Sequence, residues 1–386
     1  MTFAKSKKYL KKIVESSVYD VADITPLSPA GHLSKETKNN IFLKREDLQP
    51  IFSFKLRGAY NKISHLKKLG KVERVITASA GNHAQGVAYS AKKLRLKASI
   101  VMPVTTPSIK VSAVKNLGAQ VILVGDTYDE AYEHAIKLSK KQNYAFVHPY
   151  DDPDVIAGQG TIGKEILEQA GKDLDAVFVP VGGGGLLAGI GAYIKNLRPD
   201  VKIIGVEPEE AAGLYEAIKA NRRVTLKQVG LFVDGVAVKQ VGKVTFPIIN
   251  EWVDEVVTVS VDEICAAIED IFHETRTISE PAGALSLAGL KKLTKSKGWK
   301  NKNLVAINSG ANINFDRLSH IVERVQLGEK KEVLLSVCIL EEKGSFRQFC
   351  KDLGKRMITE FNYRIDDEKE ANIFVACRIN KGIKEK

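Results

Sequence analysis

The sequence predicts an α/β protein built on twisted, mainly parallel sheets with helices on both faces. Short apolar runs of strand length alternate with longer amphipathic segments of helical period through most of the chain. Each crossover between neighbouring parallel strands needs a helix, so regular alternation is typical of this class. With 386 residues the chain is too long for one ordinary core, and two or three domains are expected.

The alternation begins after an N-terminal helix that the spacing of Leu10, Ile13, Val14 and Val18 indicates. An extended segment starts at Thr25-Pro26, and a short strand at 41–47 ends in charge. Further strands are expected at 72–77, 98–102, 120–124, 176–181, 202–206 and 304–307. The helices that separate them are expected at 83–94, 108–117, 128–141, 158–169, from 186, 261–273 and 281–293.

The character of the sequence changes near residue 328, where a charged connector follows. Beyond it the pattern predicts a strand at 333–340, a helix at 345–354 and strands at 357–363 and 373–378. This strand-helix-strand-strand order indicates a separate small unit.

Composition and charge exclude several classes of protein. The net charge of +12 comes from scattered lysines, which favours solvated helix faces over a nucleic-acid surface. No apolar run is long enough to span a bilayer. The four cysteines show no zinc or CxxC spacing and read as reduced thiols, and the N-terminus lacks the apolar core of a signal peptide. We therefore expect a cytoplasmic protein with no metal, membrane or nucleic-acid partner.

Lys55 stands in the segment Ser53-Phe54-Lys55-Leu56-Arg57-Gly58-Ala59, at the start of an expected helix. A lysine amine that loses its proton can attack an aldehyde and later accept a proton from carbon. Taken alone, a lysine is more often a surface residue. The neighbouring motifs decide between these readings.

The glycine run from Gly182 to Gly185 follows an apolar strand and precedes Leu186. Residues without side chains let backbone N–H groups converge on a phosphate at a helix N-terminus. The run also fits a loose dinucleotide pattern with Glu207 after the next strand, so an NAD(P)-linked oxidoreductase is an alternative. A simple packing turn is the other alternative.

Two further polar segments follow predicted strands. One is Ser79-Ala80-Gly81-Asn82-His83, and the other is Ser309-Gly310-Ala311-Asn312. Ligands of parallel sheets bind beyond the carboxyl ends of the strands, where these segments and the glycine run all fall. A helix cap is the ordinary alternative for Asn82, and capping from Ala311 onward is the ordinary alternative for Ser309.

Together these motifs resemble the threonine dehydratases, which are pyridoxal 5'-phosphate (PLP) enzymes of fold type II. The resemblance implies that Lys55 forms the Schiff base with PLP and removes the α-proton, beside Phe54. It implies that Asn82 binds the phenolic oxygen, that Gly182, Gly183, Gly184, Gly185 and Leu186 hold the phosphate, and that Ser309 faces the pyridine nitrogen. The loop of Ser79, Ala80, Gly81, Asn82 and His83 would clamp the substrate carboxylate.

The resemblance further implies a large catalytic domain from residues 1–50 and 150–325 and a small one from 51–149. The implied reaction is elimination of L-threonine to 2-oxobutanoate and ammonia, the first committed step toward isoleucine, with lesser activity on L-serine. A serine dehydratase or racemase on the same scaffold is the alternative, and a silent amino-acid sensor is a second one. A homodimer or homotetramer is expected.

The last segment, 330–386, resembles part of the ACT-like regulatory domain of the long-form enzymes. Phe346 and Tyr363 would line a site for isoleucine or valine, although both suit an ordinary core. The family unit has a further helix and strand, so we expect this chain to be active but poorly inhibited by isoleucine.

Two acidic features stay open. Glu280, in Glu280-Pro281-Ala282-Gly283, fits either a site residue or an acid that complements a helix dipole. Glu207 and Glu210 are expected in a solvated acidic loop, with a cation site as the alternative.

Overall fold

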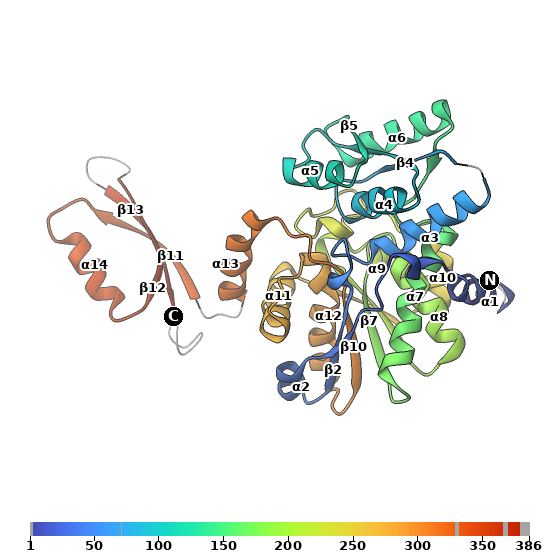
Figure 1. Ribbon diagram of the computed structural model, residues 1–386. Helices are drawn as coiled ribbons and strands as arrows, with labels where there is room; N and C mark the ends of the chain where they lie inside the picture. The colour runs from blue at the N-terminus through green and yellow to red at the C-terminus, as the bar shows by residue number, and fades with distance from the viewer. Residues whose placement is uncertain (1–2, 71, 329–331, 366–369, 379–386) are drawn as a thin grey trace. The chain divides into compact units, whose positions relative to one another are not determined.

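The computed structural model describes residues 3–70, 72–328, 332–365 and 370–378. The chain divides into two compact units, Met1–Ile313 and Asn314–Lys386. The described residues of the first unit form two sheets, and those of the second unit form one (Figure 1).

The larger sheet of the first unit has the strand order β1-β2-β10-β7-β8-β9. Its strands are β1 (Leu27–Pro29), β2 (Asn40–Arg45), β7 (Ala176–Pro180), β8 (Lys202–Pro208), β9 (Glu255–Val259) and β10 (Asn303–Asn308). All neighbours are parallel except β1 and β2, which are antiparallel. The helices that accompany this sheet are α1 (Phe3–Val14), α2 (Gly31–Thr37), α7 (Pro153–Ala170), α8 (Gly185–Leu197), α9 (Gly213–Lys219), α10 (Thr245–Trp252), α11 (Val261–Thr275) and α12 (Pro281–Lys297).

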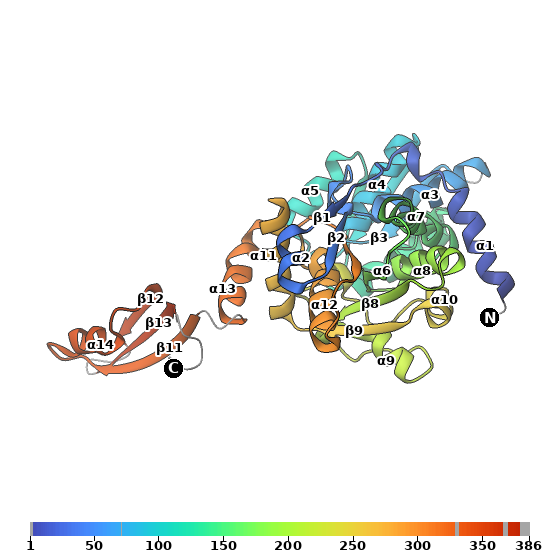
Figure 2. The same ribbon diagram turned by 90° about the horizontal axis from the view of Figure 1, so that it is seen from below.

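Helices cover both faces of this sheet. In β8 a side chain at Gly205 would meet Leu187 of α8, whereas the side chain of Val206 contacts α12 at Gly289. Successive strand residues point to opposite faces, so α8 and α12 lie on opposite sides, as Figure 2 also shows. A strand buried on both faces must be apolar throughout, which explains why every residue of β7 is buried.

The smaller sheet of the first unit has the order β5-β4-β3-β6, with all neighbours parallel. Its strands are β3 (Arg74–Ala78), β4 (Lys97–Met102), β5 (Gln120–Leu123) and β6 (Ala145–Phe146). Its helices are α3 (Lys55–Lys68), α4 (Asn82–Lys93), α5 (Ser108–Asn116) and α6 (Tyr128–Gln142). Helix α3 packs against α4, which accompanies the smaller sheet, and against α7, which accompanies the larger sheet. It therefore connects the two parts of the first unit.

Most expected elements are present with shifted ends, and several short ones were not anticipated. The helix expected from residue 158 begins at Pro153, because Asp152 accepts the N–H groups of Asp154 and Val155 and caps it. The sequence pattern does not predict the strands β6 and β9 or the helices α2, α9 and α10. These segments are short and weakly periodic, so tertiary contacts determine them.

The second unit contains α13 (Leu318–Gly328), β11 (Glu332–Leu340), α14 (Ser345–Leu353), β12 (Ile358–Ile365) and β13 (Glu370–Arg378). Its antiparallel sheet has the order β11-β13-β12. Phe349 and Leu353 of α14 pack against apolar side chains of the sheet such as Ile373 and Val375. The predicted strand-helix-strand-strand order is confirmed. In the described part of the chain, no helix has both the length and the apolar character needed to cross a bilayer.

Candidate active site

Lys55 is the first residue of α3, and its amine lies inside the first unit. The Nζ atom donates a hydrogen bond to the carbonyl oxygen of Pro149 at 3.1 Å and lies 5.3 Å from the centroid of the Phe54 ring. Burial lowers the pKa of Lys55 to about 8, although the nearby carboxyl of Glu280 opposes that shift. A substantial fraction of this amine is therefore neutral near pH 8, and a neutral amine is the nucleophilic form.

Asn82 opens α4, and its amide joins two other polar side chains. Its Nδ2 donates to Glu280 Oε1 at 2.6 Å, and its Oδ1 accepts from Asn312 Nδ2 at 2.7 Å. The cap position of α4 is Gly81, so the cap interpretation of Asn82 is wrong. The sequence motifs indicate no role for Asn312 and leave the role of Glu280 open. In the structure Glu280 contacts Asn82 directly.

Glu280 is buried in the first unit. Burial raises the pKa of its carboxyl to about 7, and the nearby Asp234 acts in the same direction. The signal in the sequence is an acid directly before Pro281, the first residue of α12. This signal is ambiguous, because an acid at that position also suits an ordinary helix start.

The loop before α4 is tightly folded. The N–H of Gly81 donates to Ser79 Oγ at 3.3 Å. His83 is buried, with Nε2 3.0 Å from the carbonyl oxygen of Val147. Burial, with the nearby charge of Lys55, lowers the pKa of His83 to about 3, so its ring is neutral at physiological pH.

The glycine run connects β7 to α8. Gly184 is the cap residue of α8, with φ of +90°, a conformation that favours glycine. Thr245 Oγ1 donates to the carbonyl oxygen of Gly183 at 2.7 Å, and the N–H of Gly242 donates to it at 3.1 Å. The peptide is planar and trans, so the N–H of Gly184 points away from these two donors. This N–H can therefore face a ligand at the start of the helix.

Residues 149–151 connect Lys55 to this loop, although no sequence motif indicates them. Pro149 accepts from Lys55, and the ring of Tyr150 fills the space in which a side chain at Gly183 would lie. The Asp151 carboxylate accepts the N–H groups of Val244 and Thr245. Packing against Tyr150 therefore requires glycine at position 183. The packing interpretation of the glycine run and the phosphate interpretation are thus compatible.

Ser309 follows β10 and is buried, and its Oγ donates to the carbonyl oxygen of Ala282 at 3.2 Å. Its own carbonyl oxygen accepts the N–H of Phe54 at 3.2 Å, which places the Ser309 loop beside the Lys55 segment. No helix begins at Ala311 in the described chain, where the next helical turn starts at Phe315, so the cap interpretation of Ser309 is wrong.

The donor set fits PLP. The amine of the half-buried Lys55 suits an aldehyde, and the amide of Asn82 suits a phenolic oxygen. The N–H groups at the start of α8 suit a phosphate, and the hydroxyl of Ser309 suits a ring nitrogen. Within the described residues, two buried atoms close to these groups have no hydrogen-bond partner, Asn308 Nδ2 and His83 Nδ1. Buried polar atoms in proteins are almost always paired, so such atoms are consistent with a ligand site.

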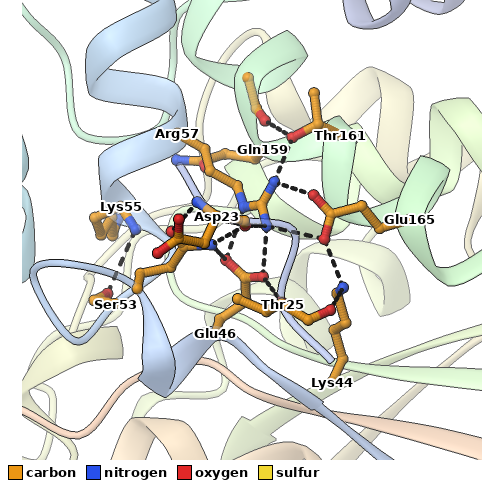
Figure 3. A network of polar contacts seen from close by, with 12 residues as sticks. Asp23, Thr25, Lys44, Glu46, Ser53, Lys55, Arg57, Gln159, Thr161 and Glu165 are labelled. Carbon is orange, nitrogen blue, oxygen red and sulfur yellow. Dashed lines mark hydrogen bonds and ion pairs between the residues drawn. The ribbon is translucent and has the colours of Figure 1, made fainter. Parts of the chain in front are cut away.

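A buried network of charges holds the helix that begins with Lys55 (Figure 3). Arg57 donates to Glu46 at 2.8 Å and to Glu165 at 2.5 Å, and Lys44 donates to Glu165 at 2.5 Å. All four side chains are fully buried. Burial opposes the charge on Glu46, but Arg57 outweighs it and holds the pKa of Glu46 below its usual value. The network ties α3 to β2 and α7.

Glu207 is buried and accepts the N–H groups of Leu214 and Tyr215, both at 2.8 Å, at the start of α9. The expectation of a solvated loop is wrong for this residue, because its carboxylate satisfies backbone donors that have no partner within the helix. Glu210 is exposed, as expected. The described residues contain no group of three or more His, Cys, Asp and Glu side chains that could hold a metal ion.

The two proposed effector residues lie together in the second unit. The rings of Phe346 and Tyr363 meet edge to face, with centroids 5.8 Å apart, and Phe361 lies 5.6 Å from Phe346. The hydroxyl of Tyr363 donates to Glu341.

Comparisons with known proteins show the family to which the chain belongs. Residues 19–310 match the family of pyridoxal-phosphate dependent enzymes, and residues 323–386 match the C-terminal regulatory domain of threonine dehydratase. The chain is 52% identical over 379 residues to the biosynthetic L-threonine dehydratase IlvA of Burkholderia multivorans, covering 97% of this chain and 75% of that protein. It is 50% identical over 379 residues to the Escherichia coli protein of the same name, covering 98% and 74%.

A solved structure gives the same result. The processed form of threonine deaminase isoform 2 from Solanum lycopersicum superposes with a TM-score of 0.83 at 49% identity, covering 85% of this chain and 90% of that one. The chain belongs to the pyridoxal-phosphate dependent enzymes and, within them, to the threonine dehydratases that carry a C-terminal regulatory domain.

Proposed function

We propose that this chain catalyses the PLP-dependent elimination of L-threonine to 2-oxobutanoate and ammonia, the first committed step toward isoleucine. The observation that carries the proposal is the half-buried Lys55, with its pKa lowered to about 8, in one site with Asn82 and Ser309. The threonine dehydratase relatives support the choice of substrate.

Each group of the chain has a distinct part in this reaction. PLP, when bound, withdraws electrons from the α-carbon. Lys55 Nζ accepts the α-proton, because its lowered pKa leaves a substantial fraction of the amine neutral near pH 8. The N–H groups of the loop 79–83, which opens α4, bind the substrate carboxylate at the positive end of the helix. Ser309 presents an uncharged hydroxyl, which favours elimination over reactions that store charge in the cofactor ring.

A 2-oxo-acid assay with threonine and serine tests the proposal. One methyl group is worth only about 1–3 kcal/mol of discrimination, so we expect threonine to be preferred with measurable serine turnover. Formation of D-serine from L-serine would instead favour a racemase. Absence of 2-oxo acid from both substrates, with PLP bound, would contradict the proposal.

We further propose that the second unit binds isoleucine or valine beside Phe346 and Tyr363. An apolar surface suits a branched side chain, and the match to a regulatory domain supports an amino-acid effector. Phe346 and Phe361 are 44% and 42% exposed, so a ligand there keeps much of its hydration, and we expect weak inhibition. Full sigmoidal inhibition of threonine turnover in an isoleucine titration would contradict weak inhibition. Unchanged inhibition by isoleucine in the Phe346→Ala variant would contradict a binding site beside Phe346.

We also propose an oligomeric state and a cellular location for the chain. We expect a dimer or tetramer in the cytoplasm. Light scattering after gel filtration measures the assembly directly.

A further inference from the structure

The orientation of the Asn82 amide decides what this site can recognise. An asparagine amide presents a donor on one side and an acceptor on the other, and its two orientations have nearly the same shape. Only the hydrogen-bond network determines which orientation the side chain adopts. In this chain the network runs from a backbone carbonyl to Asn82.

The network starts at the carbonyl oxygen of Ile51, which can only accept a hydrogen bond. Asn312 Nδ2 donates to this oxygen at 2.8 Å, so the nitrogen of Asn312 must lie on this side. The same nitrogen lies 2.7 Å from Asn82 Oδ1. A nitrogen that carries two hydrogens can make both bonds, and Asn82 must therefore turn its oxygen toward Asn312.

The other end of the Asn82 amide meets Glu280, which is 7% exposed. Asn82 Nδ2 donates to Glu280 Oε1 at 2.6 Å, and a carboxylate oxygen accepts this bond. The backbone N–H of Glu280 donates to the carbonyl oxygen of Gly310 at 3.1 Å, and the N–H of Asn312 interacts with the carboxyl group. A side chain at Gly310 would lie 2.6 Å from Glu280 Oε1, so the carboxyl group is also enclosed sterically.

We infer that Asn312 and Glu280 are positioning residues that fix Asn82 as a hydrogen-bond donor, so that this part of the site selects an acceptor oxygen. One of the two N–H bonds of Asn82 Nδ2 is used by Glu280, and the other is available to a ligand. The inference rests on the proposed function, in which that ligand oxygen is the phenolic oxygen of PLP. It adds the requirement that this oxygen be bound as an acceptor.

The variant Asn312→Asp tests polarity at constant shape. It places an oxygen against both the Ile51 carbonyl oxygen and Asn82 Oδ1, and the Asn82 amide can relieve this repulsion only by turning its oxygen toward the ligand and Glu280, at the loss of its bond to Glu280. We expect PLP to bind about 10-fold more weakly, as for loss of one charge-assisted hydrogen bond. We also expect the absorption band of bound PLP to titrate at higher pH, because its oxygen loses a donor.

Asn312→Ala separates polarity from packing. It removes more atoms but leaves the Asn82 amide free to choose its orientation. The inference predicts weaker PLP binding in Asn312→Asp than in Asn312→Ala. A purely structural role predicts the opposite order, because the larger deletion leaves the larger cavity.

Asn61→Asp is the matched control. Asn61 Nδ2 likewise donates to a backbone carbonyl, that of Asp154 at 2.7 Å, and its Oδ1 accepts from Ser16. Asn61 is not part of the proposed site. We expect this variant to lose stability while the PLP dissociation constant and spectrum stay at wild-type values.

Glu280 provides an independent pair if Asn312→Asp does not fold. Glu280→Gln keeps an acceptor oxygen for Asn82, and Glu280→Met removes it. We expect several-fold weaker PLP binding in Glu280→Met than in Glu280→Gln. Equal binding in this pair would overturn the inference, as would unchanged PLP binding and spectrum in a folded Asn312→Asp. If the wild-type chain binds no PLP, the proposed function fails instead.

Discussion

Lys55 carries the proposed chemistry because its surroundings change the properties of an ordinary lysine. Burial lowers its pKa, and the carbonyl oxygen of Pro149 fixes the position of its amine. The same helix also carries Lys62, whose Nζ atom pairs with the carboxylate of Asp152 at 2.8 Å. Two lysines in one helix thus have different tasks.

Replacing Lys55 with alanine removes both the covalent anchor and the proton acceptor. We expect threonine turnover to fall by more than the ~10²–10⁴-fold typical of general acid–base catalysis alone. Measurement of 2-oxobutanoate release tests this, with Lys62→Ala as the control on the same helix. Near-normal turnover and retained yellow colour in Lys55→Ala would contradict the assignment.

The pKa of Lys55 also predicts a pH dependence for the chain without cofactor. The neutral amine is the reactive form, and a lowered pKa makes it available at lower pH. The rate of PLP incorporation should therefore rise through about pH 8 and level off above it. With an unperturbed lysine, the rate of PLP incorporation would continue to rise toward about pH 10.4. Stopped-flow absorbance over this range distinguishes the two.

Ser309→Asp is expected to change the course of the reaction. A carboxylate at this buried position would stabilise a protonated cofactor ring and make it a stronger electron sink. Elimination should fall while transamination products become detectable by chromatography. Unchanged turnover without side products would remove Ser309 from the site.

At the scale of elements, the charged network fixes the start of α3. Arg57 reaches Glu46 beyond β2 and Glu165 in α7, with all three side chains buried. A buried charge that loses its partner is costly, whereas an exposed pair contributes little. The network therefore holds Lys55 in place more firmly than surface contacts could.

Two glutamates of α7 test this difference with the same substitution. Glu165→Gln leaves the buried Arg57 and Lys44 short of negative charge, and we expect a loss of about 3 kcal/mol in the free energy of unfolding. Glu168 is exposed, and its Oε1 atom lies 3.8 Å from Lys164 Nζ. Glu168→Gln should therefore change the free energy of unfolding by less than about 0.5 kcal/mol. Equal denaturant midpoints for the two variants would show that the network is not stabilising.

At the scale of the whole molecule, every residue of the proposed active site lies in the unit Met1–Ile313. That unit has its own apolar core, and the second unit has a separate one around Phe349 and Ile373. The proposed active site and the proposed effector site thus lie in different compact units.

Residues 1–313 produced alone should therefore bind PLP and convert threonine. They should show no response to isoleucine, since Phe346 and Tyr363 are absent. Turnover assays with and without isoleucine, beside circular dichroism, check this. A folded first unit that binds PLP but fails to turn over threonine would show that catalysis needs the second unit.

The sequence alone determined the fold class and the principal site motifs. Periodicity is a local property, so the parallel α/β pattern and the strand-helix-strand-strand unit could be predicted from it. The motifs around Lys55, Asn82, Gly182 and Ser309 are contiguous segments, and their resemblance to one family needed no contacts. Their assigned roles remain predictions.

Only the tertiary structure decided which polar residues are buried and what they contact. The strand that ends in Lys44 and Arg45 leads into a buried network, because partners come from α3 and α7, far away in sequence. Asn312 and Glu280 reach Asn82 from positions 230 and 198 residues distant. Local sequence cannot distinguish a surface acid from a buried one when its partner lies so far along the chain, because its burial depends on that partner.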